Sequence, residues 1–195
     1  MYIKYDLSIE AKIPLDLSTA RIANGLRKRI AESVKVRVGE RKSVGALLSG
    51  GLDSSVLSAL SSQYVEELHT FAAGVPDAED LGAAEEVADF IGSNHHDVIV
   101  TLDDMIKALP EVIYHLESFD ALLVRSSIMH YIVSREASRH VDEVFSGEGA
   151  DELFAGYEYI KSMKPKAIAA DIEAAVAVTD GADVRYSRKY GSELS

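Results

Sequence analysis

Residues 49–55 read Ser-Gly-Gly-Leu-Asp-Ser-Ser and stand between a short apolar segment and a segment with helical character. The apolar residues before them, 44–48, are typical of a buried strand. A Gly-Gly pair at this junction allows a tight turn and lets a ligand approach the backbone amides closely. The following helix directs its unpaired N–H groups and the positive end of its dipole at the turn. The pattern therefore predicts a phosphate-binding loop.

The side chains of this loop indicate which phosphate compound it binds. The hydroxyls of Ser49, Ser54 and Ser55 can donate hydrogen bonds to phosphate oxygens. Asp53 would repel a polyphosphate unless a cation lay between them, which predicts Mg²⁺. The loop has neither the lysine of G-x-x-x-x-G-K-[ST] nor the spacing of G-x-G-x-x-G. It resembles the PP-loop of the ATP pyrophosphatases, which split ATP between its α and β phosphates; an ordinary Gly-rich turn is the alternative.

A second loop of the same kind occupies residues 146–157, Ser-Gly-Glu-Gly-Ala-Asp-Glu-Leu-Phe-Ala-Gly-Tyr. In an open α/β sheet, ligands bind outside the carboxyl ends of the strands, near the point where the strand order reverses. Both loops could therefore face one nucleotide, with Asp53 and Asp151 sharing the Mg²⁺. The alternative for Asp151 and Glu152 is simple complementation of a helix dipole.

Strands alternate with helices along the chain, which predicts a doubly wound parallel sheet. We expect one domain over residues 1–195, with an N-terminal extension over 1–17 and a short helical C-terminal part over 163–195. Ser18 and Thr19 are candidate caps of the first helix. The expected strands are 44–48, 68–73, 95–101 and 141–145, and the expected helices are 19–38, 53–63, 79–92, 103–116, 124–139, 150–162 and 166–178.

Composition narrows the class of protein. The formal net charge of −12 argues against a large nucleic-acid-binding surface and against an anionic membrane as a partner. The absence of cysteine excludes disulfides, thiolate zinc sites and a cysteine nucleophile. The apolar runs are too short to span a bilayer, and the N-terminus does not have the pattern of a secretory signal. A cytoplasmic protein is therefore expected.

The two loops, in this order, resemble the synthetase domain of the asparagine synthetase family. The stretch between them is also similar to that family, in residues 71–74, in the pair His95-His96 and in the segment from Glu117 to Ser127. The resemblance covers about residues 20–160 and implies the PP-loop ATP pyrophosphatase fold. The second loop is the more specific of the two motifs, because other PP-loop enzymes generally lack it.

The resemblance implies an ATP- and Mg²⁺-dependent ligase. A carboxylic acid, commonly aspartate in this family, is activated as an acyl-adenylate with loss of pyrophosphate, and ammonia then forms the amide. Glu148 would stand beside the adenylate and accept the proton that ammonia loses. The other roles that the resemblance implies are phosphate binding by Ser49, Gly50, Gly51, Ser54 and Ser55; metal binding by Asp53 and Asp151; nucleotide contacts by Leu48, Ala73, Ser146 and Gly147; and substrate binding by Glu117, Asp120 and Arg125.

The chain also departs from the family. We find no glutaminase domain, so ammonia would be free, would come from a separate glutaminase subunit, or would be replaced by another amine. A Glu-x-Arg-x-Pro-Phe-Leu-Asp stretch is missing, and Ala155 stands where the family usually has glycine. In the family, a late lysine faces the leaving pyrophosphate, and its two candidate equivalents here are Arg185 and Lys189. The alternative is that both residues belong to a solvated basic tail.

Other functions remain open at this point. The chain could be a different PP-loop adenylating enzyme, such as one that makes NAD or modifies tRNA, or a weakly catalytic nucleotide-binding subunit that needs a partner. His95-His96 invites a metal-site interpretation, but adjacent strand residues face opposite ways, so a structural role is favoured. The sequence leaves open which acid is the substrate and whether the chain forms a homo-oligomer.

Overall fold

The computed structural model describes residues 18–154, 156–157, 160 and 162–163. The chain divides into two compact units, residues 1–40 and 41–195. The single domain over residues 1–195 that the sequence predicts stays a prediction. In the first unit the structure describes helix α1 (Thr19–Val38), which satisfies its backbone hydrogen bonds within itself. Ser18 occupies the N-cap, and its carbonyl group accepts from the N–H groups of Arg21 and Ile22, but its side chain makes no capping hydrogen bond.

The second unit contains the predicted parallel sheet. Its strands are β1 (Ser43–Leu47), β2 (Glu67–Gly74), β3 (Asn94–Ile99) and β4 (Val144–Phe145), in the order β3-β2-β1-β4. All three pairings are parallel, which confirms the doubly wound fold class. β4 is shorter than the predicted 141–145, because the Val141 N–H still bonds to the Ala137 carbonyl in the turn that ends the preceding helix.

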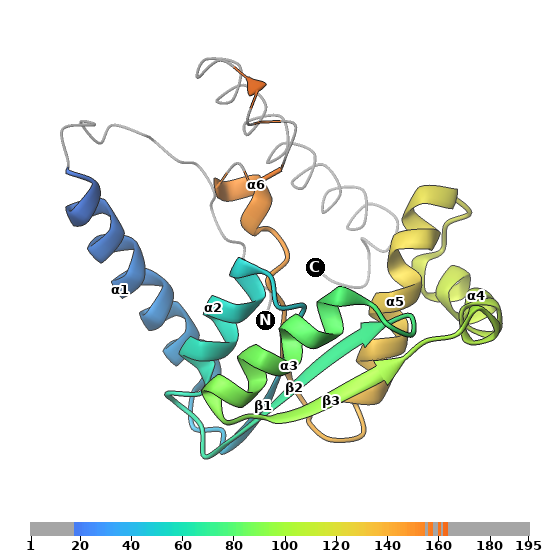
Figure 1. Cartoon of the computed structure of the whole chain (residues 1–195), viewed down its shortest axis with the longest axis horizontal. Coiled ribbons are helices and arrows are strands. Elements are labelled where there is room, and N and C mark those ends of the chain that lie inside the picture. Colours follow the sequence, from blue (N-terminus) through green and yellow to red (C-terminus); the bar gives the residue numbers. More distant parts are fainter. Residues whose placement is uncertain (1–17, 155, 158–159, 161, 164–195) are drawn as a thin grey trace, which may run out of the picture. The chain divides into compact units, whose positions relative to one another are not determined.

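Helices cover both faces of this sheet (Figure 1). On one face lie α2 (Leu52–Ser61) and α3 (Glu79–Ile91), with Leu81, Ala84 and Ala88 packed against Ala72. On the other face α5 (Ala121–Ala137) packs against Phe71, and α4 (Leu102–Leu116) packs beside α5. Neighbouring residues on β2 thus serve opposite faces, as the period of a strand requires. No helix of the described residues is long and apolar enough to cross a bilayer.

Several predicted elements begin or end at other residues in the structure, and two predicted segments lie outside the described residues. The helix after the first loop ends at Ser61, two residues before the predicted end. Helix α6 (Ala150–Phe154) is much shorter than the predicted 150–162, because the Gly156 N–H bonds to the Asp151 carbonyl and closes the turn. The N-terminal extension over 1–17 and the helix expected over 166–178 lie outside the part that the structure describes.

The strand order reverses between β1 and β4, so the loops that follow these strands meet at the same edge of the sheet. A Cβ atom on Gly147 would lie 3.2 Å from the backbone nitrogen of Ser54, at the start of α2. Gly50 has a positive φ of 74°, and a Cβ there would lie 2.5 Å from the Cβ of Ala83 on α3. Glycine at these positions allows the two loops and α3 to approach one another closely.

We expect Gly50→Ala to lower the free energy of unfolding by about 2 kcal/mol or more, since it adds left-handed backbone strain to an overlap with a helix backbone. Urea unfolding measures the change. Gly82→Ala is the matched control, because a Cβ at Gly82 on α3 meets no atom within 4 Å. That control is expected to stabilise the protein by about 0.5–1 kcal/mol. Wild-type stability in Gly50→Ala would contradict the close contact with α3.

Candidate functional site

A cavity of about 380 Å³ lies at the carboxyl ends of the strands, where the loops after β1 and β4 meet. This is within the size range of sites that hold small molecules and cofactors. The apolar part of its lining includes Leu48, Phe71, Ala73, Met129 and Val133. The polar part comes from the two loops and the first turns of α2 and α6. The cavity therefore offers an apolar compartment beside a polar one, which suits a nucleoside with phosphates.

The first loop is held in shape by hydroxyl groups. The Ser49 N–H donates to the Ser54 hydroxyl at 3.2 Å, and the two serine hydroxyls lie 3.1 Å apart. The Ser55 hydroxyl donates to the Gly51 carbonyl at 2.6 Å, so Ser55 braces the turn and does not line the cavity. The Gly51 N–H makes only a long contact of 3.4 Å with the Ser49 hydroxyl. The loop is thus set before any ligand arrives.

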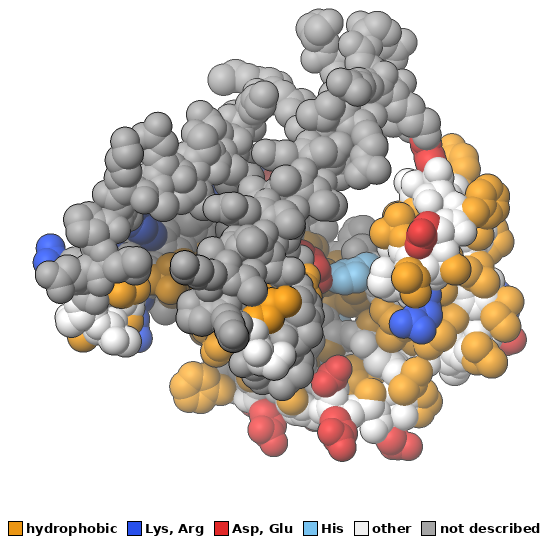
Figure 2. Space-filling model, turned by 90° about the horizontal axis from the view of Figure 1, so that it is seen from above, with side chains coloured by type: hydrophobic (Ala, Val, Ile, Leu, Met, Phe, Trp, Pro, Cys, Tyr) orange, Lys and Arg blue, Asp and Glu red, His pale blue; other side chains and the backbone are white. Residues whose placement is uncertain are grey.

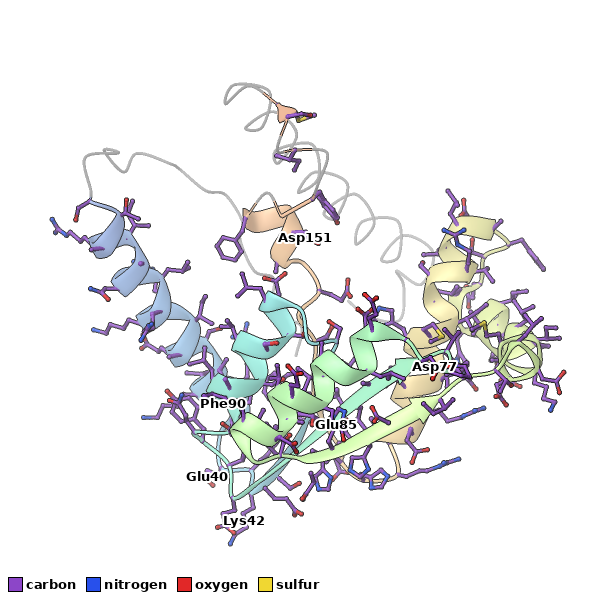
Figure 3. The ribbon with its side chains drawn as sticks, in the orientation of Figure 1. Glu40, Lys42, Asp77, Glu85, Phe90 and Asp151 are labelled. Carbon is purple, nitrogen blue, oxygen red and sulfur yellow. The ribbon has the colours of Figure 1, made fainter. Side chains whose placement is uncertain are left out.

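Two carboxylates enter the cavity from different helices. Asp53 is exposed in the first turn of α2, and Asp151 is half-buried in the first turn of α6 (Figure 3). The Asp151 carboxylate lies against Gly156, where a Cβ would be 2.0 Å from its Oδ1 atom. Within the described part of the chain, neither aspartate takes part in an ion pair. Two carboxylates facing one cavity form an oxygen donor set of the kind that Mg²⁺ prefers.

Glu148 lies at the cavity wall beside a residue that the sequence analysis missed. Its Oε1 atom is 3.4 Å from Nε2 of His130, which extends from α5. The Glu148 N–H donates to the Ser146 hydroxyl at 3.3 Å, which fixes the loop beneath its side chain. His130 reaches the cavity because α5 packs on the sheet, a contact between distant segments that local sequence patterns do not signal.

Most of the predicted site residues meet in this cavity. Gly50 lies below the loop against α3 rather than at the cavity wall. Cavity-lining residues to which the sequence analysis gave no role include Leu47, Phe71, Leu81, Met129, His130 and Val133. The predicted residues that line it are Leu48, Ser49, Gly51, Asp53, Ser54, Ala73, Ser146, Gly147, Glu148 and Asp151.

The three predicted substrate residues do not line the cavity. Asp120 is the N-cap of α5, and its Oδ1 atom accepts from the Leu122 and Leu123 N–H groups at 3.0 and 2.9 Å. Glu117 ends α4 in a left-handed conformation. Hydrophobic side chains cover the surface around α4 and the start of α5, where Leu122 is exposed (Figure 2). The roles of Glu117, Asp120 and Arg125 stay predictions.

The two candidates for the late lysine cannot be placed. Arg185 and Lys189 both lie outside the described residues, as does Ala155.

Comparison with known proteins agrees with this geometry. The model of the family described as Asparagine synthase matches residues 25–190, which include both loops. Asparagine synthetase [glutamine-hydrolyzing] of Mus musculus is 42% identical over 172 residues, covering 83% of this chain and 30% of that protein. Asparagine synthetase B [glutamine-hydrolyzing] of Escherichia coli (strain K12) is 39% identical over 151 residues, covering 70% of this chain and 27% of that protein.

The chain therefore spans less than a third of the length of these relatives. Among solved structures, an NH3-dependent NAD synthetase from Campylobacter jejuni is a distant match, with 15% identity and a TM-score of 0.49 over 69% of this chain and 60% of that chain. The family model covers most of the sequence and both loops of the cavity, and on this ground the chain belongs to the asparagine synthase family.

Proposed function

We propose that this chain carries the synthetase chemistry of an amide-forming ligase: it activates a carboxylic acid with ATP and transfers ammonia to the acyl-adenylate. The observation that carries the proposal is the convergence of Asp53 and Asp151 on one cavity, at the edge of the sheet where the two Gly-rich loops touch. Family membership supports it. Aspartate is the first acid to test, because the relatives are named asparagine synthetases.

ATP would lie across the two compartments of the cavity. The adenine ring would contact the apolar wall at Leu48 and Ala73, and the phosphates would face Ser49, Gly51 and the N-terminus of α2. The dipole of α2 and its unpaired N–H groups favour negative charge there, although the whole chain has a net charge of −12. Local amides and hydroxyls thus select an anion that the overall charge of the protein would repel.

Asp53 and Asp151 are the residues that would hold Mg²⁺, since their oxygens fit its donor preference. When bound, Mg²⁺ neutralises phosphate charge and stabilises the pyrophosphate that leaves. On the protein side, the amides of the first loop stabilise the same developing charge. Arg185 or Lys189 would add a further positive charge to the leaving pyrophosphate.

The reaction has two steps. An oxygen of the acid attacks the α-phosphorus, a new P–O bond forms, and the bond to pyrophosphate breaks with its electron pair on pyrophosphate. The nitrogen of ammonia then attacks the acyl carbon, loses a proton, and the C–O bond to AMP breaks. Glu148 accepts this proton, and His130, 3.4 Å from its carboxylate, orients it. Arg125 would recognise a substrate carboxylate, and Glu117 and Asp120 its polar groups.

The first experiment measures pyrophosphate release from ATP and Mg²⁺ with a panel of carboxylic acids that includes aspartate. Each acid is tested with ammonium, with glutamine, and with glutamine plus a separate glutaminase. We expect acid-dependent release and an amide product that requires ammonium or the added glutaminase. ATP binding by calorimetry without release with any acid would overturn the ligase proposal and favour a nucleotide-binding subunit. Release with a substrate that does not become an amide would favour a different adenylating enzyme.

Asp53→Asn and Asp151→Asn are each expected to reduce Mg²⁺-dependent pyrophosphate release by about 100-fold or more, because the leaving group loses its compensating cation. Initial rates over a Mg²⁺ series measure the effect. Asp89→Asn on α3 is the isosteric control, since Asp89 is exposed and does not line the cavity. Wild-type rates in both site variants would rule out a shared metal.

Glu148→Gln is expected to spare adenylation and to slow amide formation by about 100-fold or more, because only the second step needs a proton acceptor. Exchange of labelled pyrophosphate into ATP reports the first step, and amide yield reports the second. Glu85→Gln, at an exposed position on α3 (Figure 3), is the control. Equal losses in both steps would remove Glu148 as the proton acceptor.

A further inference from the structure

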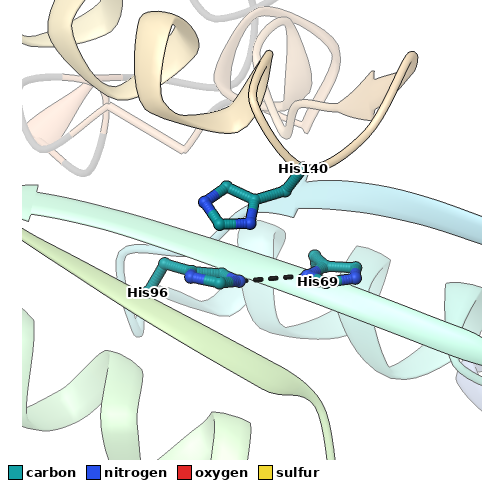
Figure 4. Close-up of side chains that lie close together, drawn as sticks. All are labelled: His69, His96 and His140. Carbon is teal, nitrogen blue, oxygen red and sulfur yellow. Dashed lines mark hydrogen bonds between the residues drawn. The ribbon is translucent and has the colours of Figure 1, made fainter.

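Three imidazoles meet on the α5 side of the sheet, outside the cavity described above. His69 extends from β2, His96 from β3, and His140 follows the end of α5 (Figure 4). One nitrogen from each ring lies within 4.8 Å of the others, and His69 Nδ1 is 3.0 Å from His96 Nε2. None of the three rings lines the nucleotide cavity.

His95 and His96 are adjacent on β3, so their side chains lie on opposite faces of the sheet. His95 Nδ1 forms a hydrogen bond with the Thr70 hydroxyl at 2.9 Å, and its Nε2 atom lies 3.1 Å from Asp97 Oδ1. His96 stacks on Phe71 instead, with ring centroids 4.8 Å apart, on the α5 side of the sheet. The adjacent histidines therefore face opposite ways, as predicted, and His96 finds its partners on β2 and after α5.

Carboxylates hold the outer nitrogens of two of these rings. Glu136 Oε1 lies 3.1 Å from His140 Nε2, and Glu67 Oε1 lies 3.4 Å from His69 Nε2. His69 therefore contacts Glu67 through Nε2 and His96 through Nδ1, and the contact of His140 with Glu136 uses its Nε2 atom. Histidines that bind metals commonly have this partner, which fixes the tautomer and makes the free nitrogen a better ligand.

We propose that His69, His96 and His140 form a binding site for a divalent transition metal ion of the Zn²⁺ class. Two imidazole nitrogens bound to one tetrahedral Zn²⁺ at its usual bond length are about 3.3 Å apart. The 3.0 Å pair of His69 and His96 must therefore open slightly, and the nitrogen of His140, within 4.8 Å of the other two, must move closer. A hydrogen bond between His69 and His96 would account for two of the rings only. The nitrogen of His140 adds the third ligand of a three-histidine metal site. Imidazole favours Zn²⁺, Cu²⁺ or Ni²⁺ over Mg²⁺, which prefers oxygen. The bound ion would join β2, β3 and the end of α5.

The test is calorimetric titration of the chain, without an affinity tag, with Zn²⁺ in the presence of millimolar Mg²⁺ and no nucleotide. We expect one Zn²⁺ per chain, and a rise in melting temperature with Zn²⁺. His140→Gln should weaken the affinity at least about 10-fold. This variant is expected to fold, since His140 is exposed. Co²⁺ in place of Zn²⁺ should give the visible absorption of a tetrahedral site in the wild type and lose it in His140→Gln.

Two controls separate this site from other groups. His115→Gln should bind Zn²⁺ as the wild type does, because His115 lies on α4 outside the cluster. Asp151→Asn should also keep its Zn²⁺, so the result does not depend on the proposed ligase activity. Absence of saturable binding, unchanged affinity in His140→Gln, or loss of Zn²⁺ in Asp151→Asn would each overturn the site.

Discussion

The approach of two backbone loops at the edge of the sheet is the constraint on which the site depends. Gly147 comes within contact distance of the Ser54 amide, and Gly50 comes closer still to the backbone of α3. Side chains at these two positions would hold the segments apart. Because the segments touch, Asp53 and Asp151, far apart in the sequence, line the same cavity. The topology of the sheet makes this meeting possible, since β1 and β4 are neighbours.

The site combines a rigid loop with an electrostatic environment that opposes the protein's own charge. The Ser54 hydroxyl takes part in several of the hydrogen bonds that fix the first loop. The backbone amides of this loop are therefore oriented before a ligand binds. Preset dipoles stabilise developing charge without having to reorganise during the reaction. Both loops contribute acidic groups to the cavity, Asp53 from the first and Glu148 and Asp151 from the second, and Glu148 lies near His130.

Local patterns in the sequence predicted the parallel fold and the two loops of the site, and the resemblance to the family implied further residues of the cavity, such as Leu48 and Ala73. They did so because strand, turn and helix signals depend on neighbouring residues, as in the turn at Gly92, where α3 ends in a left-handed glycine. Contacts between distant segments gave no such signal. His130 and the cluster of His69, His96 and His140 depend on how α5 packs on the sheet. Asp120, for which the resemblance implies substrate binding, accepts hydrogen bonds from backbone N–H groups at the start of α5. Its substrate role stays a prediction.

The shortness of β4 has a consequence for the dynamics of this protein. Only Val144 and Phe145 pair with β1, whereas β2 pairs with β1 and β3 along most of its length. Segments with few ladder hydrogen bonds open at a lower free energy than the centre of a sheet. The half of the cavity that carries Glu148 and Asp151 is therefore anchored more weakly than the half that carries Asp53. Amide hydrogens of residues 144–151 should exchange with solvent earlier than those of β1, and a bound nucleotide that touches both loops would reduce this difference.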